Sequence, residues 1–142
     1  MEVLTKVLLW LHFFGLTVGA GGGLGLSQTG PRLIKTGADG RALLWTLHDV
    51  FHRMAGAGLV VMVITGAGLA WTAFGGVNNM PAWFWVKIAF IAIALVAFGV
   101  NHRATARFRR GEECAARVMM ISGPLTGLSV QLAVLSAVLA FG

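Results

Sequence analysis

The stretch MAGAGLVVMVITGAGLAWTAF, residues 54–74, contains no charged residue and is long enough to cross a membrane. About 20 apolar residues, each rising roughly 1.5 Å along a helix, span the hydrocarbon core of a bilayer. The apolar run itself begins near residue 43, but four ionisable residues interrupt its first third: His48, Asp49, His52 and Arg53. We therefore expect the membrane-buried part to start near Met54, after an amphipathic helical extension.

Three other apolar runs have a comparable length, which gives four predicted helices at about 3–26, 43–74, 82–100 and 118–141. The chain is 57% hydrophobic and only 11% charged, with a mean hydropathy of +0.81. Because a soluble domain carries roughly 25% charged residues, this surface must meet lipid. We predict an all-α integral membrane bundle of four transmembrane helices in a single domain, 1–142. The first run lacks a basic start, so we expect a retained helix and no cleaved signal peptide.

Turn-forming residues and polar segments separate the four runs. Gly30-Pro31 and Asp39-Gly40 are turn dipeptides, which predicts a connector from Gln28 to Arg41. A short uncharged segment, 75–81, follows the second run, and a strongly polar segment, 101–117, follows the third.

The positive charges indicate how the bundle is oriented. Nine Lys and Arg residues lie in or beside the connectors after the first and third runs, whereas the opposite side has only Lys6 and Lys87. The nine are Arg32, Lys35, Arg41, Arg53, Arg103, Arg107, Arg109, Arg110 and Arg117. By the positive-inside rule, both termini face the outer (periplasmic) side of a bacterial inner membrane, which the chain crosses as a multi-pass protein. The net charge of +6 then reflects topology and contact with anionic lipids of the bilayer, and we expect no nucleic-acid partner.

His12 lies near the middle of the first predicted helix, where an ionisable group is a functional candidate by default. On a helical wheel Gly15, Gly19 and Gly22 or Gly23 lie on its side. Two interpretations stay open. The glycines form either a small-residue contact with another helix or a groove that admits a flat ligand.

Lys87 follows two tryptophans near the outer end of the third helix, in WFWVK at 83–87. One interpretation is a lysine that snorkels to the interface beside an aromatic belt. The other turns Lys87 inward, as the counter-charge of an acidic ligand such as a porphyrin propionate.

Three further histidines share the cytoplasmic side. His48 and His52 are one helical turn apart, and His102 ends the third apolar run. They are either haem or metal ligands or ordinary interfacial residues. His12 and His52 differ in depth by roughly 15–20 Å at 1.5 Å per residue, so we do not expect them to bind one iron together. Each of these two is a separate candidate metal ligand.

The order of these landmarks resembles the HemJ family of membrane protoporphyrinogen oxidases and the wider group of CopD-like four-helix proteins. The resemblance covers nearly the whole chain, and its landmarks are Lys6 and His12, the stretch 58–70, the segment 83–110 and Ser122-Gly123-Pro124. A histidine of the first helix and a lysine of the third are functional in HemJ proteins, and they fall on His12 and Lys87. The resemblance thus implies a haem b-binding oxidoreductase with these two as catalytic residues.

We expect the cofactor-binding set to be His12, Gly15, Gly19, His48, His52, Trp83 and His102. His12 and Lys87 would line one pocket in the outer half of the membrane, with Trp83 as its roof and Gly15 and Gly19 as its floor. The competing hypotheses are a CopD-like transport protein for copper or a small solute, with methionines as soft ligands, and a non-catalytic assembly factor. The many glycines also allow a homo-oligomer.

Overall fold

The computed structural model describes residues 2–78 and 80–141 and is built of helices alone in that part of the chain. The helices are α1 (Glu2–Lys35), a short 3-10 helix η1 (Ala38–Gly40), α2 (Arg41–Thr72), α3 (Ala82–Arg109) and α4 (Cys114–Phe141). Each of the four α-helices is long and apolar enough to cross a membrane. The all-α fold with four candidate membrane-spanning helices is therefore confirmed.

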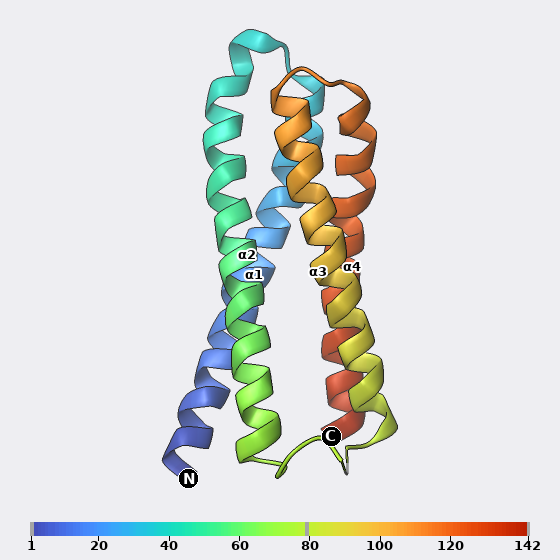
Figure 1. Cartoon of the computed structure of the whole chain (residues 1–142). Helices are drawn as coiled ribbons and strands as arrows, with labels where there is room; N and C mark the ends of the chain where they lie inside the picture. Colours follow the sequence, from blue (N-terminus) through green and yellow to red (C-terminus); the bar gives the residue numbers. More distant parts are fainter. Residues whose placement is uncertain (1, 79, 142) are drawn as a thin grey trace.

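The four helices form two antiparallel hairpins (Figure 1). α1 packs along α2, and α3 packs along α4, over most of their lengths. Between the hairpins, α1 and α4 meet over a shorter stretch, and the backbones of α2 and α3 hardly approach each other. Both chain termini lie at the same end of the bundle (Figure 1).

The helices at the opposite, basic end are longer than the apolar runs predicted. α1 continues through Gly30 and Pro31 to Lys35, so the connector expected from Gln28 is wrong in its first half. Pro31 removes only one helical hydrogen bond, and at the polar end of a membrane helix water can satisfy the carbonyl left free. α3 likewise runs to Arg109 and α4 starts at Cys114, which leaves a far shorter loop than 101–117.

Small residues bring α1 and α2 into close contact along a seam formed by Gly15, Gly19 and Gly22 of α1 and by Ala55 and Gly58 of α2. A Cβ atom added to Gly58 would collide with the backbone of Gly19. One added to Gly22 would lie 2.7 Å from the carbonyl oxygen of Phe51 and would also collide with Ala55. In lipid, where the hydrophobic effect does not drive helices together, such close backbone packing is a main source of association.

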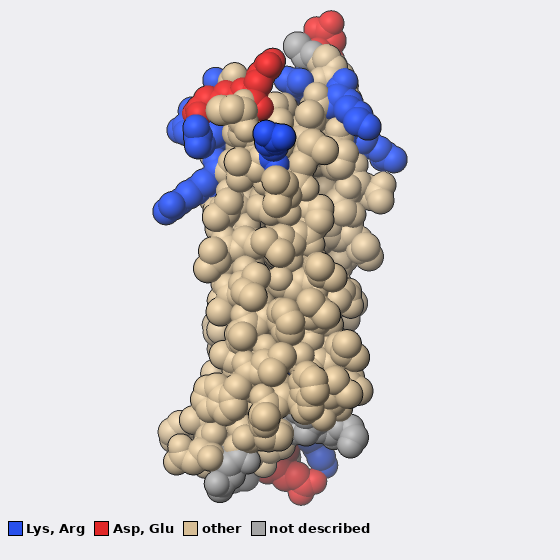
Figure 2. Space-filling view, turned by 90° about the vertical axis from the view of Figure 1, so that its right-hand side faces the viewer, with Lys and Arg blue, Asp and Glu red and all other residues tan. Residues whose placement is uncertain are grey.

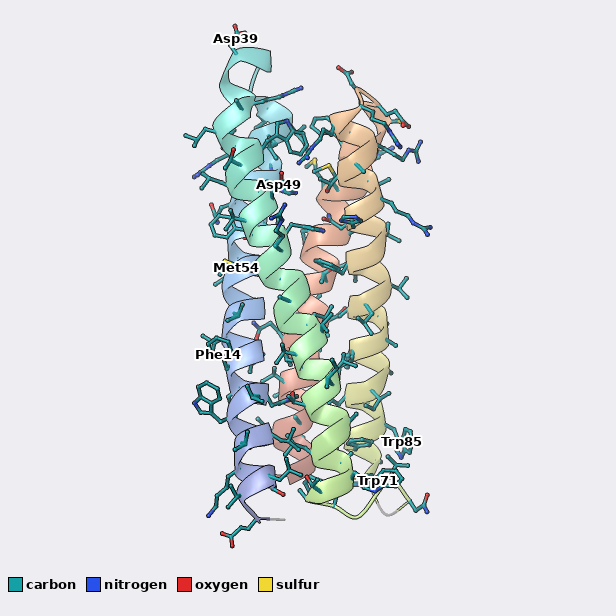
Figure 3. All side chains as sticks on the ribbon, turned by 60° about the vertical axis from the view of Figure 1, so that its left-hand side comes forward. Phe14, Asp39, Asp49, Met54, Trp71 and Trp85 are labelled. Carbon is teal, nitrogen blue, oxygen red and sulfur yellow. The ribbon has the colours of Figure 1, made fainter. Side chains whose placement is uncertain are left out.

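The surface divides into a charged end and a long uncharged body (Figure 2). Lys and Arg gather at the basic end, and the body between the two ends is built of other residues (Figure 2). Phe14 points outward from this body, while Trp71 and Trp85 lie near the end where α2 stops and α3 starts (Figure 3). These three aromatic side chains are more than half exposed, as expected for contact with lipid and its interface.

Candidate functional site

A cavity of about 230 Å³ lies between the two hairpins, lined by all four helices. Glycines open it from both sides: Gly19 and Gly23 from α1, Gly123 and Gly127 from α4. Leu59 and Met62 of α2 and Phe98 of α3 supply apolar walls, and Ser27, Asn101, Thr126 and Gln131 add polar groups. Enclosed, mostly apolar spaces with a few polar groups are where proteins commonly hold small molecules.

His12 lies on the same face of α1 as two glycines of the cavity wall, but nearer the end that carries the chain termini, and it does not itself line the cavity. Gly19 and Gly23 follow it by 7 and 11 residues, a spacing that keeps all three on one helical face. The imidazole is half-buried and crosses to α2, where it lies over Gly66, whose missing side chain leaves room for the ring.

Thr65 of α2 fixes the orientation and the tautomer of His12. The Thr65 hydroxyl donates its single proton to the carbonyl of Val61 at 2.6 Å. Its oxygen lies 2.9 Å from Nδ1 of His12, and with the hydroxyl proton directed to Val61 it accepts from Nδ1–H in the tautomer that we assign to the ring. Nε2 of His12 is then unprotonated and keeps a free lone pair. This is how proteins prepare a histidine to bind a metal or to accept a proton.

Lys87 lies on the same side of α3 as the cavity-lining Phe98, which follows it by 11 residues. Its side chain is half-buried. Lys87 makes no hydrogen bond or ion pair with any residue in 2–78 and 80–141, and its charge is near enough to interact with His12. A half-buried ammonium without a protein partner is suited to hold an acidic group of a ligand.

The expected outer-half pocket needs correction in its position and its floor. Gly15 is buried in the α1/α2 seam, where a Cβ atom added to it would lie 2.9 Å from Cγ1 of Val61. It therefore cannot form the floor of the pocket. Gly19 takes part in the seam and also borders the cavity. Trp83 is 47% exposed and does not line the cavity, as expected for a residue at the membrane interface. The space therefore lies deeper than expected, with Gly23 and the glycines of α4 in place of Gly15.

The three inner histidines come together as their spacing predicted. Nε2 of His52 lies 2.9 Å from Nδ1 of His102, which joins α2 to α3. The rings of His48 and His52 stack with centroids 6.1 Å apart. Among the described residues no group of three or more His, Cys, Asp or Glu side chains is placed to hold a metal ion. His102 engages Nε2 of His52, whereas Nδ1 of His52 is buried without a hydrogen-bond partner, so the metal role of His52 stays a prediction.

The methionines considered as soft copper ligands do not gather at one place either. Met62 borders the cavity, Met119 is buried in an apolar cluster with Phe108, and Met120 is 56% exposed.

A repeated histidine–threonine pair escaped the sequence analysis. His48 is bonded to Thr29 in the same way that His12 is bonded to Thr65, with 3.2 Å between Nδ1 and the hydroxyl oxygen. Thr29 donates to the carbonyl of Gly25, as Thr65 does to Val61. Thr29 follows His12 by 17 residues, and Thr65 follows His48 by the same 17. Each of the two antiparallel helices thus supplies the histidine of one pair and the threonine of the other, with one pair near each end of the seam. The repeated spacing of 17 residues was the signal available in the sequence.

A polar contact joins α3 to α4, and it is made by Asn101 and not by Gln131. Gln131 borders the cavity but makes no hydrogen bond with the rest of the described chain. Asn101 of α3 joins the two helices instead, because its amide donates to the hydroxyl of Ser122 at 3.0 Å and to the carbonyl of Met119 at 3.3 Å.

Comparison with protein-family models, with curated proteins and with solved structures finds no match for this chain. The function must therefore be argued from the site itself.

The role of Thr65 can be tested by replacing it with valine, which keeps the shape of the side chain and removes the hydroxyl. If His12 binds a ligand through Nε2, Thr65→Val should weaken ligand binding about 10- to 100-fold, the usual effect of removing such a supporting contact. Thr17 also donates to a carbonyl of its own helix but contacts no histidine, so Thr17→Val is the matched control. Equal ligand titration curves for the two variants would contradict the role assigned to Thr65.

Proposed function

We propose that this protein is a haem b-binding redox protein of a bacterial inner membrane, similar in activity to HemJ-type protoporphyrinogen oxidases. The observation that carries the proposal is the Nδ1 bond from His12 to Thr65. It leaves Nε2 as a free ligand atom about two helical turns before Gly19, the first residue of α1 that lines the cavity, and the charge of Lys87 is near enough to act on the ring.

The residues that line the cavity, together with His12 and Lys87 beyond its wall, are of the types that bind a porphyrin. His12 would hold the iron through Nε2, and Lys87 would pair with a propionate carboxylate. The glycines of α1 and α4 leave space against which a flat ring can lie. Asn101 and Gln131 add polar groups without adding charge.

The cavity is smaller than most ligand sites, because about 230 Å³ falls below the roughly 300–1,000 Å³ common for drug-sized molecules. A macrocycle therefore requires the hairpins to move apart. Backbone contact between the hairpins is made by α1 and α4, whereas α2 and α3 hardly approach each other, and we expect a ligand to enter from the lipid between α2 and α3.

Each residue has a defined part in the proposed reaction. When bound, the haem supplies a centre that accepts electrons. Lys87 orients an acidic substrate or cofactor by its carboxylate, and Thr65 keeps the His12 ring in one tautomer. The surrounding apolar side chains exclude water, which strengthens these electrostatic contacts.

Oxidation of protoporphyrinogen by the purified protein tests this proposal, because the porphyrin product is fluorescent and the substrate is not. The haem-loaded protein should form porphyrin with an added electron acceptor faster than haem in empty detergent micelles. An equal rate in the two samples would contradict the proposed activity.

Reporter fusions test the orientation that the proposal includes. A reporter fused after the last residue should be active on the periplasmic side, and one inserted at Gly111, in the α3–α4 loop, on the cytoplasmic side, by the positive-inside rule. The reverse pattern would place the basic end and the inner histidines outside the cell.

A further inference from the structure

The inner histidines connect the cavity to the basic end of the bundle. Phe98 lines the cavity and stacks on the ring of His52, with centroids 4.6 Å apart. His52 is bonded in turn to His102, whose side chain is exposed. Arg53 and Arg103 are the sequence neighbours of these two histidines and are also exposed, so this level of the bundle reaches the polar side of the membrane.

Two nitrogen atoms of this cluster are buried without a hydrogen-bond partner: Nε2 of His48 and Nδ1 of His52. His48 is only 2% exposed. Thr29 directs its hydroxyl proton to Gly25, so we assign His48 the tautomer in which Nδ1–H donates to Thr29 and the buried Nε2 carries a lone pair. Buried polar atoms rarely stay unpaired, and an ordered water or ion is the usual explanation.

A water molecule fits these two atoms better than a metal ion does. Water can donate to Nε2 of His48 and either donate to or accept from Nδ1 of His52, so it suits both tautomers of the His52–His102 pair. A metal ion needs lone pairs on both nitrogens and further ligands. In the part of the chain that the structure describes, no group of three or more His, Cys, Asp or Glu side chains could supply those ligands.

We propose that a bound water bridges His48 and His52 and that His52 and His102 form a proton relay from the cavity to the basic face. In the relay, Nδ1 of His52 gains a proton through this water, and Nε2–H of His52 passes its proton to Nδ1 of His102. Nε2–H of His102 then releases a proton to water outside. One proton enters and one leaves, and both rings return to neutrality. His48 positions the water and does not itself carry the proton outward.

The direction in which protons move through this relay, outward from the cavity, rests on the proposed function. Oxidation of a porphyrinogen in the cavity releases protons together with electrons, and an apolar cavity cannot retain them. Phe98 lines the cavity and stacks on His52, so the proton must pass beside its ring to reach the bound water. Asp49, Arg53, Arg103 and Arg109 are the charged residues at this level, and they set the potential against which protons leave.

Nitrogen-15 NMR of the histidine-labelled full chain in lipid bilayers tests the water site without any assay of function. Nε2 of His48 should be unprotonated at neutral pH and should show magnetisation transfer from water, and His52→Phe should abolish that transfer. A protonated Nε2, or no transfer from water in the wild-type chain, would overturn the water site. Zn²⁺ or Cu⁺ bound at one ion per chain and lost in His48→Ala would overturn it also, in favour of a metal.

Porphyrinogen oxidation tests the relay. His102→Ala should lower the turnover rate about tenfold or more, in the range of a lost acid–base group, with an unchanged KM, and added imidazole should restore it. Full turnover in His102→Ala, or a lowered rate that imidazole does not restore, would overturn the relay. If the wild-type chain has no oxidation activity, the relay is tested in proteoliposomes. The cavity side is acidified photochemically, and the rate of proton release on the basic side is measured. His102→Ala should slow this release, and imidazole should restore it. An inactive wild-type chain with an intact water site and rescued proton release refutes the proposed function and leaves the relay standing.

Discussion

Gly22→Ala should destabilise the protein strongly, whereas Gly23→Ala at the next position should not. A Cβ atom at Gly22 meets the backbone of α2 at Phe51 and Ala55, which cannot give way, while nothing lies within 4 Å of a Cβ atom at Gly23. Overpacking of this kind costs about 1–3 kcal/mol. We expect the melting temperature of Gly22→Ala in detergent to fall by about 5 °C or more. Gly23→Ala should be neutral or slightly stabilised, because alanine favours the helix by about 1 kcal/mol.

Comparing the two variants shows whether destabilisation comes from any added methyl group on α1 or only from one placed in the contact between α1 and α2. Both substitutions add one methyl group to the same turn of the same helix. Equal melting temperatures for the two variants would show that Gly22 does not lie in the seam and would contradict the packing of the first hairpin.

Removing either His12 or Lys87 should abolish the binding of a porphyrin. His12→Ala takes away the ligand atom, so we expect a loss greater than the roughly 100-fold upper limit for supporting contacts. Lys87→Met removes a charge that pairs with a carboxylate at low dielectric, a change that costs about 2–5 kcal/mol, or about 30-fold and more in affinity. The double variant should bind porphyrin no more weakly than the single variant with the lower affinity, since one ligand needs both groups.

Two matched controls accompany these variants. Lys6 is exposed and paired with Glu2 at 2.6 Å, so Lys6→Met removes a lysine from the same end of the bundle without touching the cavity. His102→Ala should leave porphyrin affinity unchanged, because His102 belongs to the inner cluster. If Lys87→Met binds porphyrin as tightly as Lys6→Met does, Lys87 is a snorkelling residue and the acidic-ligand role is wrong.

The sequence was sufficient for the fold because lipid imposes a simple rule on length and polarity. The four apolar runs each became a helix, and the even number of spans placed both termini at one end. The ends of the helices were harder to predict, because hydropathy indicates the part of a helix that lies in lipid and not the turns beyond it. α1 therefore passes through Gly30 and Pro31, where the turn dipeptide predicted a loop.

The candidate site was predictable in its residue types but only partly in its geometry. Periodicity brought His48, His52 and His102 to one level, as the structure confirms. It could not decide which glycine of α1 faces α2 and which faces the cavity, because Gly22 and Gly23 differ by only about 100° around a helix with 3.6 residues per turn. Nor could it find Thr65, since the partner of His12 is 53 residues away and is fixed by how the two helices pack.

Haem titration of the purified protein, followed by absorption spectroscopy, tests the central claim most directly. The wild-type chain should bind one haem b at the His12 site, with a sharpened Soret band and saturation near one equivalent. His12→Ala should lose that band while Lys6→Met keeps it. A wild-type spectrum identical to that of haem in empty micelles, or an unchanged band in His12→Ala, would contradict the assignment of His12 as the ligand and with it the proposed function.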